Sequence, residues 1–270
     1  MFLKNLAAVV LLATSVVPAF AQEMILAINE GVTYQDGGSP QERYRPLLDL
    51  LSRELKRPVK VVSVGKYSEF EKGLDAERYD LVFIHPAHVG LKAVKSGKYA
   101  GLATAKGFTD YRARVMVNSD SPLKSLQDLR GRKIGVPSME SITTVMFAAA
   151  LRELNFPNPE SGFTATRYQD AVPFMVENKF VVAGVTGSGK VAREWISKGG
   201  KVIAETRPVP IKQFLASRKL PEADRMRLQL LILGLSENEP GRAALGKISM
   251  TGFVPWDSAQ MNQAASRLGL

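Results

Sequence analysis

The chain has 270 residues, of which 45% are hydrophobic and 23% charged, with a formal net charge of +10 and no cysteine. This length suits one or two domains with a sizeable core, and the lack of cysteine excludes both disulfides and a lipid anchor on a cysteine. Lysine and arginine are scattered among acidic residues rather than gathered in a basic arm, which argues against nucleic-acid binding.

The first residues have the three parts of a secretory signal peptide. Lys4 supplies a positive charge, an apolar run follows from Leu6 to Val17, and Ala19-Phe20-Ala21 forms an A-x-A cleavage signature. We therefore expect residues 1–21 to be removed before Gln22 and the mature protein to reach the periplasm, without a lipid anchor. The alternatives are an uncleaved anchor or a buried strand, although the run is too short to span a bilayer of about 30 Å.

Short apolar runs then alternate with amphipathic stretches. The expected strands of the first series span 24–28, 59–64, 79–84 and 99–105, and its expected helices span 44–55, 67–76 and 87–96. The expected strands of the second series span 111–117, 133–136, 162–166, 180–185 and 201–204, and its expected helices span 126–129, 142–154, 171–178 and 191–197. The tail is expected to hold a strand at 214–217 and helices at 222–235, 241–248 and 257–268.

This alternation predicts an α/β fold with mainly parallel sheets flanked by helices. The two series predict two lobes, with two crossings of the chain between them. The first lobe is expected to be discontinuous, with residues 22–104 and 208–270, and the second lobe to span 105–207. Ligands of open α/β sheets bind beyond the carboxyl ends of the strands, so both sets of strand ends are expected to line one cleft.

The stretch GVTGSGK, from Gly184 to Lys190, fits most of a nucleotide-binding loop. The pattern requires a serine or threonine next, as a magnesium ligand, and this chain has Val191 there. A tight turn from a strand into a helix is the alternative interpretation. In that case Gly187 and Gly189 would allow the backbone to turn, and the amides at the helix start could still face an anion.

Four stretches carry a resemblance to a known family. They are YDLVFIHPAHVGLKAVKSGKY (79–99), SPLKSLQDLRGRKIGVPSMES (121–141), YQDAVPFMVENKFVVAGVTGSG (168–189) and GFVPWDSAQMNQA (252–264). The chain resembles the periplasmic substrate-binding proteins of phosphate, phosphite and phosphonate ABC transporters, a PhnD/SsuA-like group. The resemblance implies the two-lobed type 2 periplasmic-binding fold, which closes about a hinge over a small anionic ligand of the phosphonate or phosphate type and delivers it to a permease.

The resemblance also implies a ligand site at the start of the helix that follows the strand ending at Pro137. Relatives that bind phosphonates carry a serine/threonine cluster there. Here Ser138 and Ser141 remain, whereas Met139 and Glu140 stand where hydroxyls are expected. The alternative is that Ser138 is the N-cap of this helix and that Ser141 completes its first turn.

The other candidate site residues follow strand ends. Gln169 stands where the family often has a histidine, and Thr186 stands near the place of an acidic family residue. His85 follows the third strand, and a metal site formed with His88 would lack further ligands, so we expect ligand contact and no metal. The remaining candidates, Tyr34, Lys66 and Tyr67, lie in loops after the first two strands, where surface packing is the alternative.

The sequence thus predicts a monomeric binding protein without cofactor. An enzyme is disfavoured, because the chain has no cysteine, no G-x-S-x-G motif and only two closely spaced histidines. The remaining alternative is a periplasmic sensor subunit that reports ligand occupancy to a membrane histidine kinase.

Overall fold

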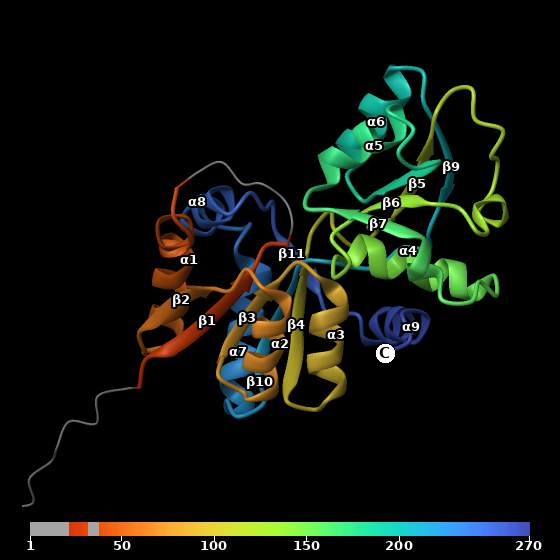
Figure 1. The fold of residues 1–270 in the computed structure, drawn as a ribbon. Helices are drawn as coiled ribbons and strands as arrows, with labels where there is room; N and C mark the ends of the chain where they lie inside the picture. Colours follow the sequence, from red (N-terminus) through yellow and green to blue (C-terminus); the bar gives the residue numbers. More distant parts are fainter. Residues whose placement is uncertain (1–21, 32–37) are drawn as a thin grey trace, which may run out of the picture.

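The computed structural model describes residues 22–31 and 38–270, so the expected signal segment and Tyr34 lie outside the described residues. Figure 1 shows two lobes, each built on a β-sheet, that are joined by two crossings of the chain. The predicted α/β class is confirmed. Both sheets are mixed, because strands that run in the opposite direction are inserted among the parallel ones.

The first lobe contains a six-stranded sheet in the order β11-β4-β10-β3-β1-β2. Its strands are β1 (Met24–Asn29), β2 (Val59–Ser63), β3 (Leu81–Ile84), β4 (Tyr99–Ala105), β10 (Gln213–Ser217) and β11 (Phe253–Pro255). β1 pairs in parallel with β2 and β3, while β10 lies antiparallel between β3 and β4. All five residues of β10 are buried, so this late segment of the chain lies at the centre of the first core.

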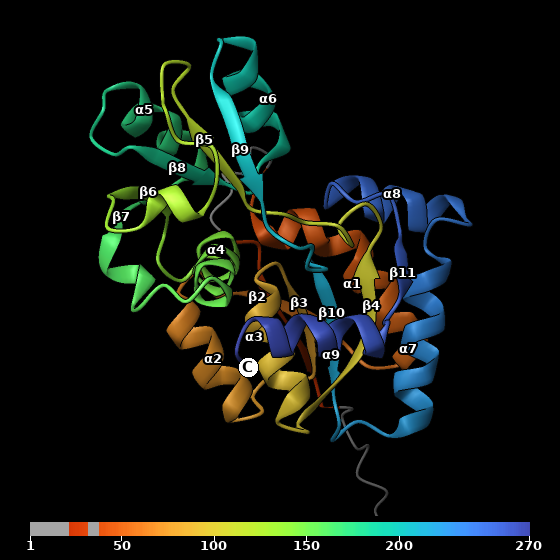
Figure 2. The same cartoon turned by 90° about the vertical axis from the view of Figure 1, so that its right-hand side faces the viewer.

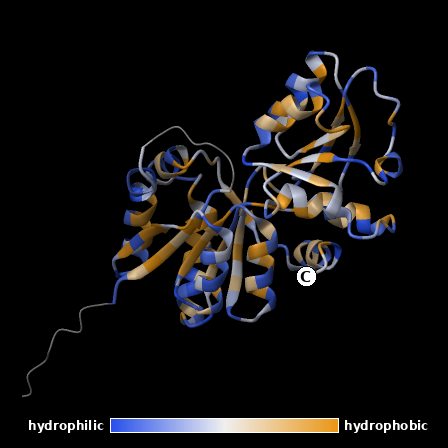
Figure 3. Ribbon diagram, in the orientation of Figure 1, coloured by the Kyte–Doolittle hydropathy of each residue, from blue (hydrophilic) through white to orange (hydrophobic). Residues whose placement is uncertain are grey.

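Helices cover both faces of this sheet. The helices α1 (Pro40–Leu55), α7 (Glu222–Gly234) and α8 (Glu239–Lys247) share one apolar cluster with one face, and α2 (Tyr67–Asp75) and α3 (Ala87–Lys95) share another with the opposite face. The start of α1 is fixed by a capping box, in which Ser39 and Glu42 each accept a hydrogen bond from the other's backbone amide. Figure 3 shows the apolar strands between these more polar helices.

The second lobe contains a five-stranded sheet in the order β7-β6-β8-β5-β9. Its strands are β5 (Arg114–Val117), β6 (Ile134–Pro137), β7 (Phe163–Thr166), β8 (Ala183–Thr186) and β9 (Lys201–Glu205). α4 (Ile142–Glu153) packs on one face, and α5 (Val172–Glu177) and α6 (Gly189–Ser197) pack on the other. Trp195 of α6 is buried and its indole Nε1 donates to the Val117 carbonyl at 3.0 Å.

Two crossings join the lobes, the first crossing at 106–113 and the second crossing at 206–212. They run side by side, because the Val209 amide donates to the Tyr111 carbonyl and the Ile211 amide to the Phe108 carbonyl, both at 2.9 Å. The last helix, α9 (Ser258–Arg267), lies beside them (Figure 2). Arg267 donates to the Pro208 carbonyl at 3.2 Å. The exact lobe boundaries at 104 and 208 stay a prediction.

α9 also connects the cores of the two lobes. One apolar cluster contains Leu91 of α3, Met261 and Ala264 of α9, and Met146 and Phe147 of α4. The first lobe, the second lobe and the C-terminal helix therefore share a continuous patch of buried surface on one side of the crossings.

Two expected strands begin later than the sequence indicates. The run from Phe180 enters its strand only at Ala183, because Lys179 has a positive φ of 58° and the Phe180 amide turns back to the Met175 carbonyl. The run from Tyr111 enters its strand at Arg114, since residues 111–113 belong to the first crossing. The three-residue strand β11, which ends at Pro255, was not predicted.

Candidate functional site

Most of the candidate residues follow strands whose carboxyl ends meet at one edge of their sheet. In the first lobe the parallel strands β1, β2 and β3 lead into Glu30, the Lys66-Tyr67 pair and His85. In the second lobe β6, β7 and β8 lead into the Ser138–Ser141 loop, Gln169 and Gly187. This topology gathers each set of polar residues at one edge of its own sheet.

The two edges meet near the first crossing. The rings of His85 and Tyr111 lie edge to face, with their centroids 6.0 Å apart. Burial raises the pKa of the Tyr67 hydroxyl, and Glu140 of the second lobe and Tyr111 raise it further, so these groups lie near one another across the lobes. We name the group at this meeting point the interlobe site. It comprises Tyr67, His85, Tyr111, Gln169 and Lys212.

Lys66 and Tyr67 start α2 but differ in environment. The Tyr67 side chain is buried and its hydroxyl forms no hydrogen bond with any described residue, which leaves it available to a ligand. The Lys66 side chain is 78% exposed and its ammonium lies 3.1 Å from Glu69, one turn along the same helix. The structure therefore brings Tyr67 into the interlobe site and leaves Lys66 at its margin.

Both histidines are held neutral by burial. Burial, with smaller contributions from Lys212 and His88, lowers the pKa of His85 to about 3, and burial and then Lys92 lower the pKa of His88 to about 4. The buried Nδ1 atom of each ring has no hydrogen-bond partner among the described residues. Gly31 lies against the His85 ring, and a β-carbon there would approach its Cδ2 to 2.8 Å, so glycine allows this packing.

Lys212 is a cation at the junction of the second crossing with β10. Its ammonium lies 4.4 Å from the centroid of the Phe108 ring and forms no salt bridge with any described residue. Burial lowers the pKa of Lys212, and Glu30 raises it in part. The Lys212 amide donates to the His85 carbonyl at 3.4 Å, which fixes its backbone next to that histidine.

Glu30 forms a bidentate pair with Arg43 of α1, at 2.8 and 2.5 Å, and accepts a third hydrogen bond from the Tyr44 hydroxyl at 3.1 Å. The pair is largely buried, with side chains 10% and 18% exposed. This pair links the end of β1 to α1, and the Glu30 carboxylate therefore bonds to Arg43 and Tyr44 and not to Lys212.

Gln169 lies at the centre of a hydrogen-bond network in the second lobe. Its side-chain oxygen accepts from the Thr186 hydroxyl at 3.1 Å, the Gly187 amide at 2.5 Å and the Ser188 amide at 2.9 Å. Its side-chain nitrogen donates to the Tyr111 hydroxyl at 3.3 Å, and that hydroxyl lies 2.7 Å from the Thr143 hydroxyl. The structure thus brings Gln169 and Thr186 together, and the amides before α6 face Gln169.

The helix start at α4 is an internally bonded N-cap. Ser141 is 2% exposed, its hydroxyl accepts from the Thr144 amide at 3.2 Å, and it lies 3.0 Å from the Thr144 hydroxyl. The N-cap of α4 is therefore Ser141, and the predicted capping by Ser138 is wrong, because the helix begins only at Ile142. Ser138 is half-buried and Glu140 is exposed. Ligand contact by Ser138, Glu140 and Ser141 stays a prediction.

Sequence reasoning did not single out Tyr111, Thr143 or Lys212. Tyr111 was assigned to a strand and Lys212 to the tail, because the chain gives no local signal that the two crossings lie side by side. Thr143 lies in the first turn of α4, where a threonine has no distinctive pattern. The one available signal was position, since Tyr111 and Lys212 both flank the expected crossings.

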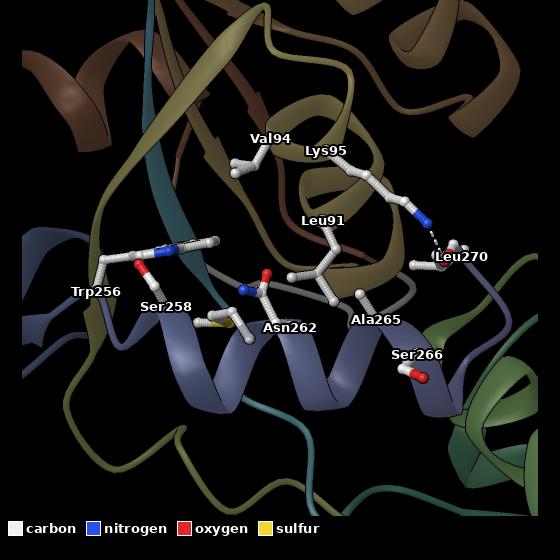
Figure 4. Close-up of a pocket in the computed structure, with 10 residues that line it drawn as sticks. Leu91, Val94, Lys95, Trp256, Ser258, Asn262, Ala265, Ser266 and Leu270 are labelled. Carbon is white, nitrogen blue, oxygen red and sulfur yellow. Dashed lines mark hydrogen bonds between the residues drawn. The ribbon is translucent and has the colours of Figure 1, made fainter.

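A pocket lies between α3 and α9, away from these residues (Figure 4). This pocket has a volume of about 490 Å³, and its walls include Leu91, Val94 and Trp256. Lys95 points to the far end, where its ammonium donates to the Leu270 carbonyl at 2.5 Å. None of the predicted site residues lines it.

Within 22–31 and 38–270, no three side chains of the metal-binding types come close enough to hold an ion. In the same part of the chain, no helix combines the length and apolar character of a membrane span.

Comparison with known proteins gives one family match. The model of the periplasmic substrate-binding proteins of phosphonate ABC transporters matches residues 32–261. No curated protein sequence is significantly similar to the chain.

Solved structures share the fold at low sequence identity. A Xanthomonas citri protein solved with ATP is 17% identical over 92% of this chain and 97% of its own, with a TM-score of 0.75. PhnD1 from Prochlorococcus marinus, in complex with methylphosphonate, is 16% identical over 91% and 96%, with a TM-score of 0.68. The aliphatic sulphonate binding protein SsuA from Escherichia coli is 14% identical over 91% of each chain, with a TM-score of 0.61. The predicted type 2 periplasmic-binding fold is confirmed.

Proposed function

The chain belongs to the family of periplasmic substrate-binding proteins of phosphonate ABC transporters, which capture a small ligand for a membrane transporter, and on that premise we propose that it binds a small oxyanion at the interlobe site. The oxyanion is phosphonate- or phosphate-like, and movement of the lobes about the two crossings encloses it. Binding at micromolar concentration corresponds to about −8 kcal/mol, which a few charge-assisted hydrogen bonds in a dry site can supply.

The observation that carries this proposal is the ammonium of Lys212. A largely buried cation without a salt bridge to a described residue is costly unless an anion completes its surroundings. Glu30, which raises the pKa of Lys212, is itself bonded to Arg43 and Tyr44. No carboxylate oxygen of the described chain lies within 4.0 Å of the Lys212 ammonium, so an oxyanion could occupy that position.

Two helix starts support the same charge preference. α2 and α3 begin at the interlobe site without a side-chain cap, so amides of their first turns remain unpaired within the described chain. Such amides and the helix dipole favour an anion. The Tyr67 hydroxyl, at the first residue of α2, adds a neutral donor, and the neutral His85 ring adds no competing charge.

Lys212→Gln tests the proposal, with Lys219→Gln as the matched control. Both lysines flank β10, but the Lys219 side chain is 63% exposed and lies 3.4 Å from Glu77 at the opposite end of the strand. Loss of a charged hydrogen bond of about 1.5–3 kcal/mol predicts at least about tenfold weaker binding for Lys212→Gln and no change for Lys219→Gln. Calorimetry would measure this with inorganic phosphate, methylphosphonate and methanesulfonate. Wild-type protein that binds none of the three, or equal binding by both variants, would refute the proposal.

The remaining parts of the function are proposals on the same footing. Removal of residues 1–21 on export agrees with their sequence pattern, and the protein would bind its ligand without chemical conversion, as its family of binding proteins indicates. The partner would be a permease of an ABC transporter. The sensor alternative stays a prediction, since a histidine kinase sensor domain resembles the chain only in fold, at 15% identity and a TM-score of 0.55.

A further inference from the structure

The orientation of the Gln169 side-chain amide is fixed by its neighbours. Its oxygen accepts from the Thr186 hydroxyl and from the amides of Gly187 and Ser188. Backbone amides can only donate, so the amide nitrogen cannot occupy that place. The nitrogen must therefore face the Tyr111 hydroxyl, at 3.3 Å, and donate to it.

Thr143 also donates to the Tyr111 hydroxyl. Its side chain is 0% exposed, and within the described chain its hydroxyl has one hydrogen-bond partner, the Tyr111 oxygen at 2.7 Å. If Tyr111 donated to Thr143, the Thr143 proton would be buried without an acceptor, which is unfavourable. In the opposite direction the proton without a partner is that of Tyr111, whose side chain is half-buried, whereas Thr143 is fully buried.

The Tyr111 oxygen then accepts two hydrogen bonds, which uses both of its lone pairs. Its own proton has no acceptor among the described residues. The side chain is half-buried, and its ring lies against His85, where the first crossing meets the first lobe. Burial raises the pKa of Tyr111, so the hydroxyl stays protonated throughout the physiological range.

Glycine at 187 makes this arrangement possible. A β-carbon there would overlap the Tyr111 hydroxyl and lie 2.7 Å from the Thr143 hydroxyl. At the same time Gln169 engages the amides of Gly187 and Ser188, which lie before α6. These two amides are therefore not available to recognise a ligand.

We propose that Tyr111 donates a hydrogen bond to the ligand and that Gln169 is the positioning residue that makes this hydroxyl a donor. The inference rests on the proposed function, and it sets the ligand class more narrowly. The ligand presents an unprotonated acceptor oxygen at Tyr111, such as a phosphoryl, sulfonyl or carboxylate oxygen. An amine at that position has no acceptor to meet, because both lone pairs of Tyr111 are in use.

Three variants separate this assignment from its alternatives. Tyr111→Phe removes the donor and should weaken binding of methylphosphonate or methanesulfonate at least about tenfold. Thr143→Val removes one hydrogen bond to Tyr111 but leaves its proton free, so binding should stay within about threefold of wild type. If the two variants weakened ligand binding equally, Thr143 would be the donor to the ligand and the proposal would be overturned. Unchanged binding by Tyr111→Phe would also overturn it.

Gln169→Glu supplies a readout that a purely structural role would not give. At pH 8 the carboxylate would accept the Tyr111 proton and repel the anion, so methanesulfonate should bind at least about a hundredfold more weakly. Below about pH 4, under the ordinary glutamate pKa of about 4.3, the protonated carboxyl can donate to Tyr111 as the amide does, and binding should recover, while wild-type binding stays level. A loss that does not change with pH would overturn the positioning role.

The controls keep the two proposals distinguishable. Thermal unfolding identifies any variant that does not fold, and the other two variants then decide the assignment. If Lys212→Gln weakens binding but the Tyr111 and Gln169 variants do not, this inference fails and the proposed function stands. If wild-type protein binds neither methylphosphonate nor methanesulfonate, both proposals fail.

Discussion

Gly187 offers a direct test of the packing that builds the site. In Gly187→Ala the new methyl group would overlap the Tyr111 hydroxyl and lie 2.7 Å from the Thr143 hydroxyl. Tyr111 is anchored by its ring contact with His85 and by the neighbouring second crossing, so its hydroxyl can move only by leaving its partners. Gly189→Ala is the matched control, because its methyl group would meet only the mobile end of Arg193, at 3.2 Å.

The two substitutions are expected to change the free energy of unfolding in opposite directions. Displacing Tyr111 breaks its hydrogen bonds with Gln169 and Thr143 and leaves a fully buried threonine unpaired, which costs about 1–3 kcal/mol. Overpacking adds about 1 kcal/mol or more, and replacement of glycine returns up to about 1 kcal/mol by restricting the unfolded chain. Gly187→Ala should therefore lower the free energy of unfolding by about 1–3 kcal/mol, combining these terms. Gly189→Ala, in the first turn of α6, should raise it by about 0.5 kcal/mol.

Urea denaturation followed by circular dichroism measures both variants against wild type. Neither glycine has a positive φ, so backbone strain does not distort the comparison. The reasoning would be refuted if Gly187→Ala matched or exceeded wild type in stability, because Tyr111 and Thr143 would then not be packed against the Gly187 backbone.

Two further predictions concern titration and capping. Burial lowers the pKa of His85 to about 3 and the pKa of His88 to about 4. Between those values and about 6.5, the unfolded chain therefore binds more protons than the folded chain. The free energy of unfolding should fall as the pH decreases through that range, by up to about 1.4 kcal/mol per pH unit for each histidine. His85→Gln combined with His88→Gln should flatten the urea-derived slope between about pH 6.5 and 5, and identical slopes would contradict the predicted burial. Ser141→Ala removes the α4 cap and should lower the free energy of unfolding by about 1 kcal/mol. The control is Ser138→Ala, because the Ser138 hydroxyl forms no hydrogen bond with a described residue, and urea unfolding of this variant should match wild type. Equal free energies for the two variants would show that the cap has no stabilising role.

The sequence predicted the elements well where local periodicity decides them. The runs of Leu47, Leu51 and Leu55, and of β-branched residues in β2, have the spacing that their elements require, and all four of the longest expected helices are present. It did not predict that β10 pairs between β3 and β4. Pairing between segments more than 100 residues apart in the sequence leaves no local trace, since any buried strand has the same apolar composition.

The sequence could indicate candidate residues only where position or resemblance marks them. Tyr67 and His85 were singled out because they follow strands, and Gln169 because it stands where the family often has a histidine. Tyr111 and Lys212 could not be found in this way, because their roles depend on two crossings that lie side by side and on a network through Thr143. The sequence placed the cap of α4 at Ser138 instead of Ser141, because either serine before the helix could serve as the cap.

The position of α9 has a practical consequence for measuring ligand response. Its apolar contacts with α3 and α4, and the bond from Arg267 to the Pro208 carbonyl, place the C-terminus beside the axis about which the lobes would turn. A fluorophore attached at Leu270 would therefore travel little and report little. Because the chain has no native thiol, dyes on single engineered cysteines in α5 and α8, far from that axis on opposite lobes, would give a larger change in energy transfer for the same rotation.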